Sequence, residues 1–72
     1  MTKYLIVLEE TSNGFSAYSP DIPGCVATGA TRADVEREMH DAIVFHLEGL
    51  KEAGLQVPKA VSSSAYVEIA VA

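Results

Sequence analysis

The residues with the most informative chemistry in this 72-residue chain are its two histidines, because imidazole binds metal ions and transfers protons near neutral pH. His40 and His46 are six residues apart, about 120° around a helix, whereas one ion held by one helix needs an i, i+4 pair. The spacing predicts no metal site within one chain. It assigns His40 to a surface pair with Glu36 and His46 to a packed apolar stripe, with an interface or pH-sensitive role for His46 as the alternative.

The other nucleophilic or acidic residues lack the neighbours that catalysis needs. Cys25 has no adjacent cation, so we expect a small buried thiol; as the only cysteine it permits no disulfide and fits a reducing cytoplasm. The serines at 62–64 have no nucleophile elbow or oxyanion loop and are expected in an ordinary loop. Asp21, between two prolines, suits an Asx turn or a partner contact. The sequence predicts no catalytic residue, no metal and no cofactor.

Composition limits the classes of partner. Five Lys and Arg against ten Asp and Glu give a net charge of −5, which disfavours binding to nucleic acid or an anionic membrane and favours a basic protein. Hydrophobic residues make up 49%, as in a folded domain. The apolar run at 4–8 is too short for a signal peptide or a membrane span. We expect one cytoplasmic domain over residues 1–72.

Turn and cap residues divide the chain into five elements. Strands are expected at residues 2–10, 15–19, 25–28 and 65–72, with hairpin chemistry at Asn13-Gly14 and a type II turn at Pro23-Gly24. A helix is predicted from Arg32, capped by Thr31, to a stop at Gly54. Its apolar stripe comprises Val35, Met39, Ala42, Ile43, His46, Leu47 and Leu50. The order β-β-β-α-β predicts an α+β fold in which one helix packs on one face of a mostly antiparallel sheet.

The first strand is apolar on both faces, and one helix covers only one of them. Tyr4, Ile6 and Leu8 alternate with Leu5 and Val7. We therefore expect another chain to cover the second face, as a homodimer, a higher homo-oligomer or a complex with a protein partner.

Several motifs in order resemble the HicB antitoxin family. The most specific is the Pro-Asp-x-Pro-Gly-Cys stretch at residues 20–25, followed by Gly-x-Thr at 29–31 and the helix. The resemblance spans nearly the whole chain and is carried by residues 4–9, 13–15, 18–25, 29–31 and 42–50 and by Val57-Pro58. It implies a partial ribonuclease-H-like fold without the metal-binding carboxylates of the nucleases.

The resemblance also implies a function, that of an antitoxin covering a small basic HicA-type toxin that cleaves mRNA. An acidic cover competes for the cations that would hold RNA phosphates. We take Glu9, Glu10, Asp21 and Glu68 as candidate contacts. Many family members continue into a C-terminal DNA-binding domain, and we expect none within these 72 residues.

A different class of function is the alternative, a stand-alone homo-oligomeric domain that binds a small ligand. It would require His40 or His46 to converge across a subunit interface.

Overall fold

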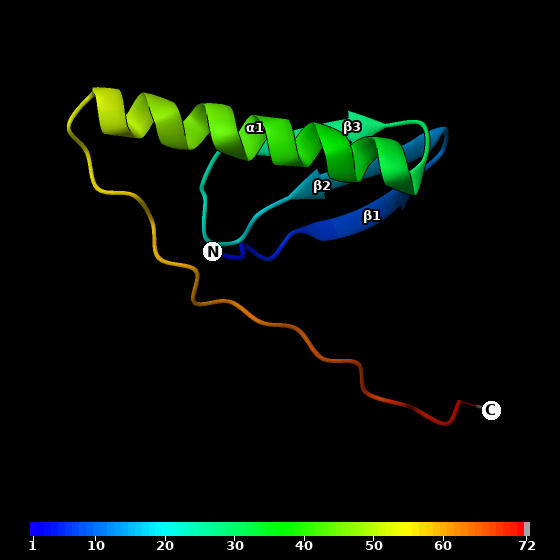
Figure 1. Ribbon diagram of the computed structural model, residues 1–72. Helices are drawn as coiled ribbons and strands as arrows, with labels where there is room; N and C mark the ends of the chain where they lie inside the picture. Colours follow the sequence, from blue (N-terminus) through cyan, green and yellow to red (C-terminus); the bar gives the residue numbers. More distant parts are fainter. Residues whose placement is uncertain (72) are drawn as a thin grey trace.

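The computed structural model describes residues 1–71 and contains a three-stranded sheet and one long helix (Figure 1). The elements are β1 (Val7–Thr11), β2 (Gly14–Tyr18), β3 (Val26–Gly29) and α1 (Arg32–Glu52). The sheet is antiparallel in the order β1-β2-β3. This confirms the α+β class and the expected order as far as the helix.

Local turn chemistry sets the strand connections. Thr11 pairs with Gly14, so the two-residue hairpin loop is Ser12-Asn13, one residue before the predicted Asn13-Gly14 position, and Gly14 is the first residue of β2. In the next connection Gly24 has a φ of 80°, and the amide of Cys25 donates to the carbonyl of Ile22 at 3.2 Å. That bond and the positive φ are the features expected of a type II turn at Pro23-Gly24.

The helix begins and ends where its cap residues predict. The Thr31 hydroxyl accepts a hydrogen bond from the Asp34 amide at 3.1 Å, and Asp34 lies in the first turn, where the helix dipole favours an acid. At the other end Gly54 has a φ of 73°, and the Leu55 amide donates to the carbonyl of Leu50 at 2.9 Å.

The core lies where α1 packs against strands β2 and β3. Its buried hydrophobic residues are Ala17, Ile22, Cys25, Val35 and Met39. Gly29 lets the helix approach closely, since a Cβ there would lie 2.6 Å from the backbone nitrogen of Val35. The predicted apolar stripe is confirmed, because every member of it is buried or half-buried.

Two expectations about strands were wrong. The first strand is shorter than predicted and begins at Val7. The predicted strand at 65–72 is absent from its described part, residues 65–71, which pair with no strand; Ala72 lies outside the described residues. The alternating pattern gives this segment a preference for extended backbone, but a strand also needs a neighbouring edge.

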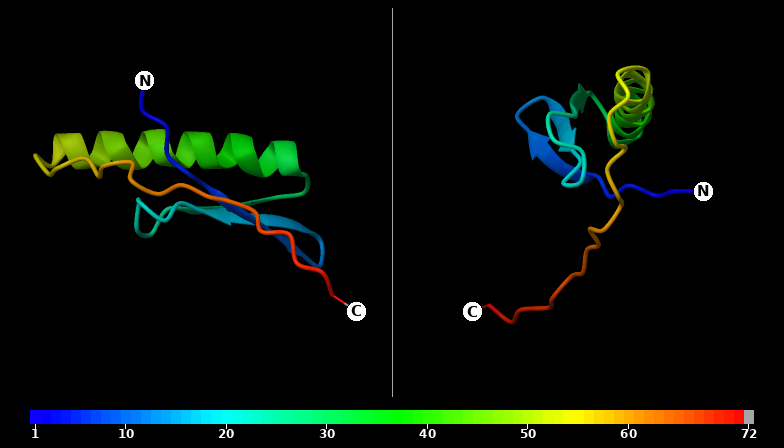
Figure 2. Two further views of the ribbon diagram at one scale, coloured as in Figure 1. Left: turned by 90° about the horizontal axis from the view of Figure 1, so that it is seen from below. Right: turned by 90° about the vertical axis from the view of Figure 1, so that its left-hand side faces the viewer.

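Residues 59–71, here called the arm, run in extended form away from the helix end and past the sheet (Figures 1 and 2). Just before the arm, the Tyr4 hydroxyl donates a hydrogen bond to the Pro58 carbonyl at 2.6 Å. Across residues 1–71, no helix has the length and hydropathy needed to cross a bilayer.

Candidate partner-binding surface

The sheet face opposite the helix is open, and the strand register gives its composition. Residues directly opposite each other share a face, so Val7, Tyr18 and Val26 form one cross-strand row on this side. Tyr18 is 42% exposed and Val26 69% exposed. Leu8, Ala17 and Ala27, one position along each strand, form the next row and face the helix. The open face therefore presents an apolar row within the described chain.

A polar row lies beside the apolar one. Glu9, Ser16 and Thr28 are paired across the three strands on the open face, toward the β1–β2 hairpin. Glu10 is the next residue on β1, so its side chain points to the helix side, and both glutamates are exposed. Two carboxylates thus flank the hairpin end of β1.

The four candidate contacts lie at three separate places. Glu9 and Glu10 are neighbours on β1, at the hairpin end of the sheet. Asp21 follows β2, whose last residue, Tyr18, pairs with the first residue of β1, so Asp21 lies toward the opposite end. Glu68 is exposed on the arm. The structure brings only Glu9 and Glu10 together.

Asp21 makes long-range hydrogen bonds in place of the local Asx turn that we expected. One carboxylate oxygen accepts from the amides of Val61 and Ser62 at 3.1 and 3.0 Å, and the other accepts from the Ser62 hydroxyl at 2.8 Å. The bonds from the Ser62 amide and hydroxyl, with a further one from Val61, lower the pKa of Asp21 below its ordinary 3.8. Asp21 therefore binds the start of the arm.

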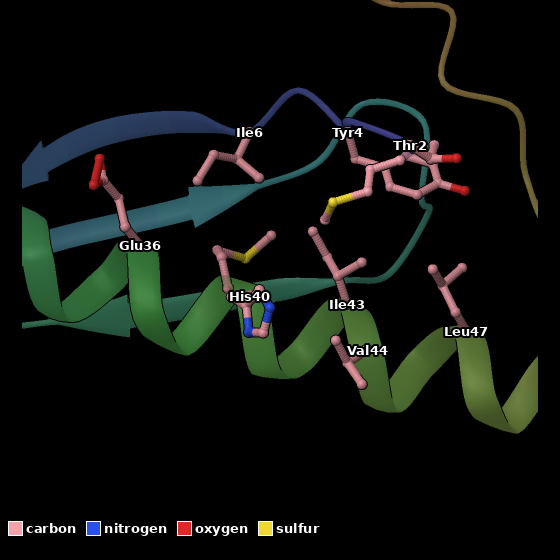
Figure 3. A pocket seen from close by; sticks show the side chains of 10 residues that line it. Thr2, Tyr4, Ile6, Glu36, His40, Ile43, Val44 and Leu47 are labelled. Carbon is pink, nitrogen blue, oxygen red and sulfur yellow. The ribbon is translucent and has the colours of Figure 1, made fainter.

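A groove runs between the N-terminal segment and α1 (Figure 3). Its volume is about 380 Å³, and Tyr4, Ile6, Ile43 and Leu47 contribute apolar walls. His40 lines it as well, and Figure 3 shows that side chain on the helix facing the groove. This groove forms because α1 packs mainly on β3 and β2 and leaves the helix side of the N-terminal segment uncovered.

The histidines, the cysteine and the loop serines lie in separate surroundings. His40 is exposed, with Nδ1 3.1 Å from an Asp41 oxygen, and His46 is half-buried on the apolar stripe. Cys25 is buried, and desolvation raises the pKa of its thiol. Over residues 1–71, no three His, Cys, Asp or Glu side chains converge in a way that could hold a metal ion.

Sequence reasoning found the acidic hairpin but missed the apolar row and the groove. The alternation in β2 separates Tyr18 from Ala17, but Val26 joins Tyr18 only through the register between β2 and β3. That register depends on the length of the connection at residues 19–25, which the sequence pattern does not specify to one residue. The groove depends on where the helix sits on the sheet, for which no local motif codes.

A protein-family model matches nearly the whole chain. The model described as "HicB_like antitoxin of bacterial toxin-antitoxin system" matches residues 4–70.

Two individual proteins are also similar. An uncharacterized 14.9 kDa protein from the rep-hol intergenic region of Haemophilus phage HP1 is 33% identical over 64 residues, which are 89% of this chain and 48% of that protein. The chain thus spans about half the length of this curated relative. A solved structure entitled "HicA3 and HicB3 toxin-antitoxin complex" contains a chain that matches with a TM-score of 0.72 and 35% identity, over 83% of this chain and 70% of that one.

Proposed function

Because the chain belongs to the HicB-like antitoxin family of bacterial toxin–antitoxin systems, we propose that it binds and masks a small basic HicA-type toxin that cleaves mRNA. The observation that carries this proposal is the open sheet face, where an apolar row with exposed Tyr18 and Val26 adjoins Glu9, and Glu10 follows Glu9 on the helix side of β1. The similarity to a chain from a HicA–HicB complex supports a toxin of that class as the partner.

The composition of this face suits a basic protein. The apolar row of Val7, Tyr18 and Val26 would supply the desolvated centre of an interface, and an aromatic residue such as Tyr18 is a frequent hot spot. Glu9 and Glu10 would form part of a charged rim that steers a cationic partner and sets its orientation. Asp21 and Glu68 remain candidate contacts in this proposal, with Asp21 already engaged by the arm.

Masking requires no chemistry from this chain. A toxin that cleaves RNA must hold phosphate with cationic side chains, and a carboxylate-bearing surface competes for those cations. The chain would act in the cytoplasm as a non-enzymatic ribonuclease inhibitor, as a homodimer or higher homo-oligomer. Its net charge of −5 favours association with a basic toxin and disfavours direct binding to RNA or DNA.

The test is calorimetric titration of this chain into a purified HicA-type toxin at low and high salt. We expect the double variant Glu9→Lys/Glu10→Lys to weaken binding by about tenfold or more at low salt, and less at high salt. The matched control is Glu48→Lys/Glu52→Lys, which makes the same change in net charge at exposed positions near the end of α1.

The two double variants separate local contact from overall charge. Equal losses would mean that only net charge matters, and unchanged affinity in the hairpin variant would remove Glu9 and Glu10 from the interface. Tyr18→Ala tests the apolar row independently, and we expect it to raise the Kd at both salt concentrations because its contribution is not screened.

A further inference from the structure

The arm has the residue pattern of a strand but no strand beside it. Val67, Ile69 and Val71 fall on one side of the extended chain and are 70–85% exposed. No backbone–backbone hydrogen bond joins residues 56–71 to the rest of the described chain. A lone apolar strand gains stability only when another strand satisfies its backbone and buries its side chains.

Two contacts fix the start of the arm and direct the remainder outward. The Tyr4 hydroxyl holds the Pro58 carbonyl, and the Asp21 carboxylate holds the amides of Val61 and Ser62. Beyond these contacts the trace leaves the body of the protein, as the right-hand view of Figure 2 shows. The apolar part of the arm is therefore presented away from its own sheet.

The sheet offers an edge of the kind that the arm needs. β1 is an outer strand of the sheet, and α1 packs chiefly against the other two strands, β2 and β3. Beside β1 is a hollow of about 270 Å³, lined by residues 5–8 with Arg32, Ser64 and Tyr66. An open edge next to a hollow can accept a further strand and its side chains.

We propose that the arm of one copy adds as a strand to the β1 edge of a second copy, which returns its own arm in the same way. One chain carries both the unpaired strand and the unpaired edge, so a two-fold exchange satisfies both at once. The chain's own arm reaches the hollow only at Ser64 and Tyr66 and then diverges from β1. A basic toxin is a poorer occupant, since residues 65–71 carry a single charge, on Glu68.

The first test uses the chain alone, without toxin, and measures its mass in solution over a range of concentrations by sedimentation. We expect a dimer. Successive backbone N–H groups of a strand point to opposite sides, so Glu68→Pro and Ile69→Pro are compared, and at least one must remove a ladder bond. Whichever of these two variants removes a ladder bond should raise the dimer Kd by about tenfold or more. Gln56→Pro, upstream of both contacts, is the matched control and should leave the Kd unchanged.

A wild-type chain that stays monomeric would overturn the proposal, and so would two proline variants that dimerise as the wild type does. The helical circular dichroism of each variant checks folding, which the exposed position of the substitutions should preserve.

A cross-linking test distinguishes exchange between copies from pairing within one chain. Val67→Cys in one preparation is mixed with Glu9→Cys or Glu10→Cys in another, and paired strands bring Cα atoms within disulfide range. A disulfide-linked heterodimer is the expected result, with Cys25 alone as the unreactive control because it is buried. A chain that carries both Val67→Cys and Glu9→Cys tests pairing within one copy. If this double variant forms the disulfide within a monomer, the arm pairs in cis and the proposal fails.

Discussion

Replacing Gly29 by alanine should destabilise the fold because this glycine seats the helix on the sheet. A Cβ there would lie 2.6 Å from the nitrogen and 3.0 Å from the Cα of Val35, both of them backbone atoms that cannot rotate away. The φ of Gly29 is not positive, so alanine could otherwise adopt its conformation and would gain about 0.4–1 kcal/mol through the unfolded state. Overpacking costs about 1–3 kcal/mol and outweighs that gain.

We expect Gly29→Ala to lower the free energy of unfolding by about 1–2 kcal/mol, which in a domain of this size lowers the Tm by roughly 5–15 °C. Urea unfolding followed by circular dichroism at one protein concentration measures it, since association would otherwise shift the apparent stability.

Gly49→Ala is the matched control for this prediction. Gly49 lies inside α1, and an added Cβ meets nothing within 4 Å. Here the same substitution should stabilise the protein by about 0.5–1 kcal/mol, because glycine inside a helix loses more backbone entropy than alanine. Opposite signs for the two variants support the helix placement. A Gly29→Ala protein as stable as the wild type would refute the close approach of α1 to β3.

Three further outcomes follow from the core, the helix cap and the arm. Met39→Ala should lower the free energy of unfolding by about 2–5 kcal/mol, measured by urea unfolding, because Met39 is fully buried. Thr31→Ala should cost about 0.5–2 kcal/mol in the same assay, while Thr31→Ser, which keeps the capping hydroxyl, should cost much less. Because hydrogen bonding lowers the pKa of Asp21 below 3.8, the bound arm is favoured above that pH and released as the pH falls through the lowered value. Hydrogen exchange at residues 61–62 should therefore be slow at pH 6, and fast in Asp21→Asn at the same pH.

Local chemistry was the part of the fold that the sequence predicted well. Thr31 begins the helix, Gly54 ends it, and Pro23-Gly24 makes a turn, because each depends on a few adjacent residues. The arm shows where such reasoning stops. Its alternating residues favour extended backbone, but they do not specify the strand edge with which the arm pairs, and within residues 1–71 the arm pairs with none.

The candidate surface was predictable to a similar extent. The two-sided apolar pattern of the first strand predicted an uncovered face, and the structure shows one opposite α1. Which residues of β2 and β3 lie on this face, Tyr18 and Val26 among them, depends on the pairing register between strands. The separation of Asp21 from Glu9 depends on the same register. The contact between Asp21 and Ser62 spans 41 positions and has no sequence signal.

The most direct test of the central proposal is an RNA-cleavage assay with a purified HicA-type toxin and increasing amounts of this chain. Masking predicts that cleavage falls in proportion to added chain and stops when the toxin is saturated, with no RNA bound by the chain itself. Undiminished cleavage at a clear excess of folded chain over that toxin would contradict the proposal.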